Sequence, residues 1–82
     1  MLTVNIRLPD AELKAIIEAH CASFGTVKFI RLLPVAKDNS HRFAFVEMAT
    51  LAETMDLAVN TGGSTLGSGA VALWLEAAPE EN

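Results

Sequence analysis

The segment from His41 to Met48, with the sequence HRFAFVEM, constrains the fold of this 82-residue chain more than any other segment. Side chains alternate between the two faces of a β-strand, so one face of this segment carries an alanine, a valine and a methionine. These side chains make an adequate core-facing surface. Two aromatic rings, Phe43 and Phe45, then remain on the other face. Two outward rings at this spacing can serve as platforms on which unpaired bases stack.

Three further segments have the alternation of a strand. Apolar residues at every second position predict strands over residues 2–7, 27–33 and 70–76. Residues 37–40 are polar and turn-like, which indicates a hairpin loop before the HRFAFVEM strand. Residues 62–69 are too rich in glycine for a helix and predict a flexible connection with short strand pieces.

Two segments have the spacing of amphipathic helices. The first is expected to begin with Asp10 as its N-cap and to end at Gly25. The second follows the sequence TLAE, a capping box in which Thr50 is the N-cap and Glu53 the third helical residue. The predicted order of elements is therefore strand, helix, strand, strand, helix, strand.

The segment HRFAFVEM resembles the octamer of the RNA recognition motif family, whose pattern is basic, glycine, aromatic, small, aromatic, aliphatic, variable, aromatic. Phe43 and Phe45 occupy the two central aromatic positions, and Arg42 stands where the family has glycine. Together with the order of elements, the resemblance extends over residues 1–77 as one domain. Residues 78–82 form a short acidic tail.

The resemblance implies an α+β fold of the ferredoxin-like βαββαβ type. In that family a four-stranded antiparallel sheet has the spatial order 4-1-3-2, and both helices pack on one face. The first and third strands are then central, and their outward side chains form the binding surface.

The resemblance also implies single-stranded RNA as the partner, bound with modest affinity by Phe43 and Phe45 on the open side of the sheet. The family's first strand normally offers an outward ring, but Thr3 stands at that position here. Trp74 either replaces the missing ring or is partly buried under the acidic tail, and the pattern leaves both open. Polar or basic contacts to RNA are expected from Asn5, Arg7, Arg31 and His41, although His41 is equally compatible with a solvated turn residue.

The charge of the chain weakens this hypothesis. Six basic and ten acidic residues give a net charge of −4, whereas attraction to phosphate supplies most nonspecific nucleic-acid affinity. Most of the basic residues nevertheless fall in predicted strands or in the loop before the octamer, so the fold is expected to separate the charges by face. These residues are Arg7, Lys28, Arg31, Lys37 and Arg42. Glu47, on the same face as the two phenylalanines, is expected to repel phosphate.

A second hypothesis keeps the fold but changes the partner. The outward rings, with Phe29 added, can equally form a contact patch for another protein or for a second copy of the chain. The acidic net charge, the missing first-strand ring and the lack of tyrosine favour this hypothesis.

The sequence offers no basis for catalysis. It contains no recognisable nucleophile and base pair and no set of metal ligands, so no enzyme activity, metal or cofactor is expected. His20 and Cys21 are adjacent on the first helix and are interpreted as structural. The longest apolar run is six residues and no secretory leader is visible, so no membrane partner is expected. A single cysteine favours a reducing, cytoplasmic location.

Overall fold

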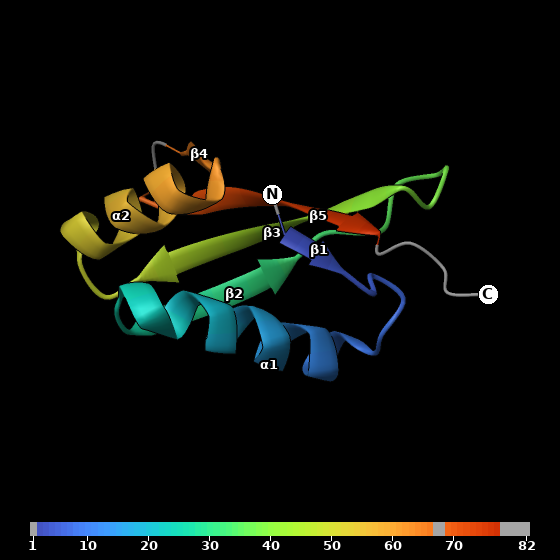
Figure 1. Cartoon of the computed structure of the whole chain (residues 1–82), viewed down its shortest axis with the longest axis horizontal. Coiled ribbons are helices and arrows are strands. Elements are labelled where there is room, and N and C mark those ends of the chain that lie inside the picture. The colour runs from blue at the N-terminus through green and yellow to red at the C-terminus, as the bar shows by residue number, and fades with distance from the viewer. Residues whose placement is uncertain (1, 67–68, 78–82) are drawn as a thin grey trace.

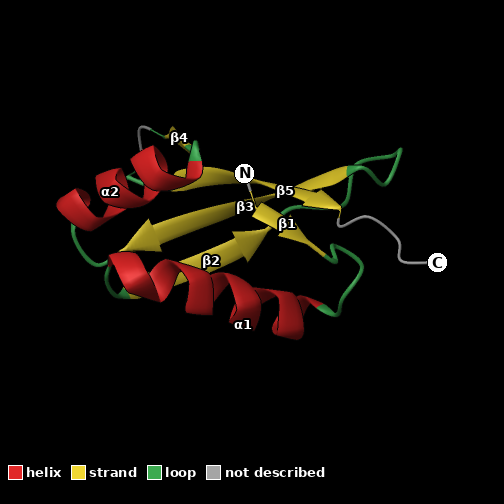
Figure 2. Ribbon diagram, viewed as in Figure 1, coloured by secondary structure: helices red, strands yellow, loops and turns green. Residues whose placement is uncertain are grey.

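Alternating apolar side chains in the strands and apolar stripes on the helices build two layers, a β-sheet and a pair of helices (Figures 1 and 2). This computed structural model describes residues 2–66 and 69–77. The predicted acidic tail at residues 78–82 lies outside the described part. The predicted α+β class is confirmed.

The elements follow the predicted order, with one additional short strand. The helices are α1 (Asp10–Cys21), followed by a 3-10 turn at Ala22–Phe24, and α2 (Leu51–Thr61). The strands are β1 (Leu2–Val4), β2 (Val27–Leu32), β3 (His41–Met48), β4 (Ser64–Thr65) and β5 (Val71–Ala77).

A single core lies between the sheet and both helices, which therefore cover the same face (Figure 1). From the helices it receives Leu13, Ile17, Cys21, Leu57 and Ala58. From the sheet it receives alternate residues of β3 and β5, namely Ala44, Val46, Met48, Val71, Leu73 and Leu75. The opposite face of the sheet is called the open face below.

The sheet does not have the predicted strand order. Its strands lie in the order β1-β5-β3-β2, and β4 pairs with β5. The prediction of four antiparallel strands in the order 4-1-3-2 is therefore wrong in three respects. The sheet has five strands, β1 is an edge strand, and β1 runs parallel to its neighbour β5.

The lengths of β1 and β5 explain why β5, and not β1, takes the central position beside β3. A central strand forms hydrogen bonds along both edges, so a long apolar strand gains more from that position than a short one. β5 pairs with β3 from Glu76 opposite His41 to Val71 opposite Val46. β1 ends at Val4, because the following Asn5 side chain accepts a hydrogen bond from the backbone N–H of Arg7 at 3.1 Å and starts a turn.

The two helix starts differ in how well they were predicted. Asp10 is the first residue of α1 rather than its N-cap, which is Pro9, and no side chain caps this end. The predicted N-cap of α2 is confirmed, since the backbone N–H of Glu53 donates to the Thr50 hydroxyl at 3.2 Å. The Glu53 side chain accepts a hydrogen bond from the Thr50 hydroxyl at 2.8 Å, where a full capping box has one from the Thr50 backbone N–H. The Glu53 carboxylate also accepts a hydrogen bond from the backbone N–H of Thr26 at 2.8 Å. This bond joins the start of α2 to the segment that leads into β2.

Candidate nucleic-acid interface

Strand β3 presents Phe43 and Phe45 on the open face. Both rings are half-buried, whereas Ala44, Val46 and Met48 between and beyond them are buried in the core. The predicted orientation of the two phenylalanines therefore agrees with the structure. Their role in binding bases stays a prediction.

Trp74 lies directly beside these rings, because β5 rather than β1 is the neighbour of β3. Trp74 pairs with Phe43 across the two strands, and the ring centroids are 5.2 Å apart in an edge-to-face arrangement. The His41 ring stacks on Trp74 with a centroid separation of 4.1 Å and an interplanar angle of 13°. His41, Phe43 and Trp74 are called the aromatic cluster below.

The aromatic cluster resolves two alternatives that the sequence left open. Trp74 is 40% exposed on the open face, so an outward ring is present even though the first strand lacks one. His41 begins β3 and is held by its ring contacts with Phe43 and Trp74. It is therefore part of a packed aromatic surface and not a solvated turn residue.

The three candidate residues from the N-terminal segment do not join this surface as predicted. Thr3 is exposed on the edge strand and pairs with Glu76 of β5, so a whole strand separates it from β3. Asn5 and Arg7 lie in the turn after β1 and not in a strand. The expectation that they flank the phenylalanines on a central strand is wrong, because it depended on the order 4-1-3-2.

A second part of the open face contains a hollow of about 270 Å³. It is lined by Phe29 and Arg31 of β2, Phe45 and Glu47 of β3, and Leu66 and Ala70 from the two sides of the β4–β5 turn. These six residues are called the hollow below. Ala70 is 5% exposed and is the smallest of the six side chains. The hollow lies above Ala70, and the five larger side chains form its walls.

Sequence reasoning found only part of the hollow. The outward positions of Phe29 and Arg31 were predicted from the alternation of β2, and the structure confirms that both are exposed. Leu66 and Ala70 were missed, because they belong to the glycine-rich segment. The backbone N–H of Leu66 donates to the carbonyl of Ala70 at 2.8 Å and closes a hairpin there. The signal for it was the glycine at position 69, whose φ of +88° suits a tight turn.

Charges of both signs lie on the open face. Arg31 is paired in register with Phe45, and Phe29 with Glu47, so the two charged side chains lie diagonally across β2 and β3. The Lys28 ammonium lies 3.9 Å from the Glu47 carboxylate, and the two side chains are 65% and 28% exposed. Such a pair contributes little to stability.

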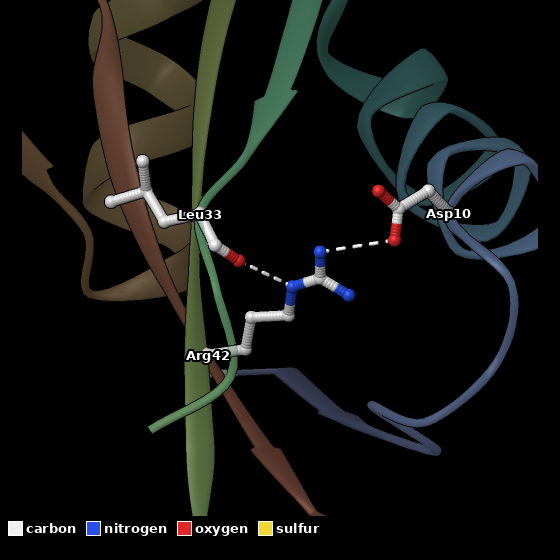
Figure 3. A network of polar contacts seen from close by, with 3 residues as sticks. All are labelled: Asp10, Leu33 and Arg42. Atoms are coloured by element: carbon white, nitrogen blue, oxygen red, sulfur yellow. Dashed lines mark hydrogen bonds and ion pairs between the residues drawn. The ribbon is translucent and has the colours of Figure 1, made fainter. Parts of the chain in front are cut away.

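Arg42 does not contribute to this surface, although it was one of the basic residues expected on the sheet side. Its guanidinium points to the helix side of β3, where Nε donates to the carbonyl of Leu33 and a terminal nitrogen lies 3.0 Å from Asp10 Oδ1 (Figure 3). The side chain is only 9% exposed. The expected separation of charges by face is therefore incomplete, since one of the five basic residues expected on the sheet side faces the helices.

The histidines and the cysteine, which could support other chemistry, lie outside the aromatic surface except for His41. Among the described residues, no group of three His, Cys, Asp or Glu side chains could hold a metal ion. Cys21 is buried in the core, and burial raises the pKa of its thiol to about 11. A thiol in this state is a poor nucleophile at neutral pH. His20 is exposed and not part of the core, and its ring lies 6.3 Å from that of Phe24.

Comparison of the chain with protein family models, curated proteins and solved structures finds no match. Within the part of the chain that the structure describes, neither helix is long and apolar enough to cross a membrane. Membership of the RNA recognition motif family stays a hypothesis that rests on the octamer and on the order of elements.

Proposed function

We propose that this protein binds single-stranded RNA on the open face of its sheet, as a binding domain without a catalytic step. The observation that carries the proposal is the group of rings on that face, where the aromatic cluster lies beside Phe45. Stacking of a base on an aromatic side chain contributes roughly 1–3 kcal/mol per base. Two or three such contacts would provide most of the affinity.

The charges of the open face suit weak, stacking-dominated binding. Lys28 of β2 can meet phosphate and Arg31 can contact either phosphate or a base, while Glu47 and Glu76 oppose phosphate. One or two phosphate contacts give a slope of about −0.7 to −1.4 for the logarithm of the association constant against the logarithm of salt concentration. The affinity is therefore modest and only weakly dependent on salt. A cytoplasmic location is part of the proposal, because the single thiol stays reduced there.

Trp74 provides the signal for a direct test, since it is the only tryptophan of the chain. Titration with a short single-stranded oligoribonucleotide is expected to quench its emission. Phe43→Leu and Phe45→Leu, which remove the rings but keep apolar side chains, should each weaken binding about 5-fold to 100-fold. Val59→Ala is the matched control, because Val59 is an exposed apolar residue of α2 in the helix layer. Equal affinities for all four proteins would contradict the proposal.

A second candidate function is contact with another protein through the same face. The observation that favours it is the exposure of two large apolar side chains there, Phe29 at 45% and Trp74 at 40%, on a chain of net charge −4. Sedimentation equilibrium separates the two candidates. A dimer that the Phe43→Leu and Phe45→Leu substitutions disperse, together with no response to RNA at tens of micromolar, would establish protein contact instead.

A further inference from the structure

The hollow lies beside the aromatic cluster and differs from it in chemistry, because it combines two rings with one positive and one negative side chain. We infer that the hollow is a subsite for a single guanine base of the bound RNA. This inference rests on the proposed function and extends it, since it names the base that one position of the RNA should carry.

The size of the hollow limits its occupant to a small group, such as one base. Its volume of about 270 Å³ is slightly below the ~300–1,000 Å³ typical of pockets for drug-sized ligands. The register of the sheet explains its shape. Val46 pairs with Val71 at the end of the β3–β5 ladder, and the adjoining residues of the two segments, Glu47 and Ala70, both line the hollow. The small Ala70 side chain leaves room above it, and the rings of Phe29 and Phe45 offer apolar surface on the β2 and β3 side.

Glu47 provides selectivity among the bases, because an ionised carboxylate only accepts hydrogen bonds. The Watson–Crick edge of guanine carries two adjacent donors, N1–H and the N2 amino group, which match the two carboxylate oxygens. Adenine and cytosine each place an acceptor beside their single amino donor, and uracil has one donor between two carbonyl groups. Guanine is therefore the base whose edge fits Glu47.

The surroundings of the Glu47 carboxylate leave it able to accept hydrogen bonds from a base. Among the described residues, its polar partner is the Lys28 ammonium at 3.9 Å, a distance longer than a hydrogen bond. Its side chain is 28% exposed, so contact with a base in the hollow requires little additional burial. The turn at Gly69 lies close by, since a side-chain carbon placed on this glycine would be 3.8 Å from Glu47 Oε1.

Arg31 suits the other side of the same base. O6 and N7 of guanine are adjacent acceptors, and an arginine guanidinium commonly donates to both. Arg31 and Glu47 both line the hollow, and no ion pair joins them in the described structure. Glu47 is thus available as the acceptor for N1–H and the N2 amino group, and Arg31 as the donor to O6 and N7. These donor and acceptor groups are adjacent on guanine. A phosphate group would be attracted by Arg31 but repelled by Glu47, so a base is the better occupant.

The test uses heptamers of uridine in which the central nucleotide is guanosine, adenosine or inosine, with binding followed by Trp74 emission. The native protein should bind the guanosine heptamer at least about fivefold more tightly than the adenosine heptamer. Inosine lacks the N2 amino group and should fall between them. This comparison changes only the RNA, so it does not depend on the folding of a variant.

Glu47→Gln distinguishes recognition from a general effect of charge. The substitution should weaken binding of the guanosine heptamer about fivefold or more, yet leave binding of the uridine heptamer unchanged or slightly tighter, because a negative charge is lost. Glu76→Gln removes the same charge from the open face outside the hollow and should affect both heptamers alike.

Two results would overturn the inference, and they are distinguishable. If the heptamers bind equally, and Glu47→Gln has the same effect as Glu76→Gln, the guanine subsite is rejected while RNA binding stands. If no heptamer binds the native protein at tens of micromolar, the proposed function fails together with the subsite.

Discussion

Arg42, the second residue of β3, has a structural role in this chain. Its guanidinium joins β3 to the carbonyl of Leu33 after β2 and to Asp10 at the start of α1 (Figure 3). Burying a guanidinium is costly unless its donors find acceptors, and these two partners satisfy two of its five N–H groups. The Arg42 side chain thus joins the start of α1 to the sheet.

We expect Arg42→Ala to lower the free energy of unfolding by about 2 kcal/mol, because it removes charge-assisted hydrogen bonds of a mostly buried side chain. Asp10→Asn should cost about 1 kcal/mol or less, since the Asp10 side chain is 65% exposed. Urea denaturation measures both values. Arg31→Ala, an exposed arginine on β2, is the control and should change stability by about 0.5 kcal/mol or less. A loss for Arg42→Ala no greater than that of the control would refute the structural role.

The thiol of Cys21 makes stability depend on pH in the alkaline range. Burial raises its pKa from 9.0 to about 11, so the folded state favours the protonated thiol. The stabilisation is complete below pH 9.0 and is lost as the pH rises towards 11.

Burial of Cys21 can be tested by alkylation of its thiol. We expect alkylation of the native protein to be slow at pH 8 and fast in urea at the same pH. Rapid alkylation without denaturant would show that Cys21 is accessible.

At the scale of elements, the exchange of β1 and β5 determines which side chains meet. In the predicted order, Thr3 would lie beside the octamer strand and the binding surface would lack a ring. In the observed order, β5 brings Trp74 opposite Phe43, and Thr3 is displaced to the edge. The same strand also carries Ala70 to the hollow through the β4–β5 turn.

The strand order can be tested by NMR spectroscopy in solution. We expect cross-strand contacts between Phe43 and Trp74, and none between Phe43 and Thr3. The amide protons of β1 should exchange with solvent faster than those of β3, because a three-residue edge strand opens locally without global unfolding. Contacts between Phe43 and Thr3, with strong protection of β1, would restore the order 4-1-3-2.

For the whole molecule, local patterns predicted the faces of the elements but not their neighbours. The small and aliphatic residues between the two phenylalanines gave β3 its correct orientation, because alternation depends only on the strand itself. The position of β1 was mispredicted, since the alternation of Leu2, Val4 and Ile6 does not reveal which strand they pair with. Strand length decided this, and Asn5 shortens β1 by starting a turn.

The candidate site was likewise predicted where it depends on a single strand and missed where it depends on the pairing of strands. Phe43, Phe45 and Arg31 were placed on the open face from alternation alone. The contacts of Trp74 with His41 and Phe43 depend on the pairing of β3 with β5, and the hollow depends in addition on a hairpin within the glycine-rich segment. Long-range pairing of this kind is not visible in a local pattern.

RNA binding by the whole open face is tested most directly by mapping backbone and aromatic NMR shifts during titration with a guanosine-containing uridine heptamer. We expect the largest changes at outward residues of β2, β3 and β5, with the rings of Phe45 and Trp74 among them, and little change along α2. Changes confined to the helices, or none at tens of micromolar RNA, would contradict RNA binding by the open face.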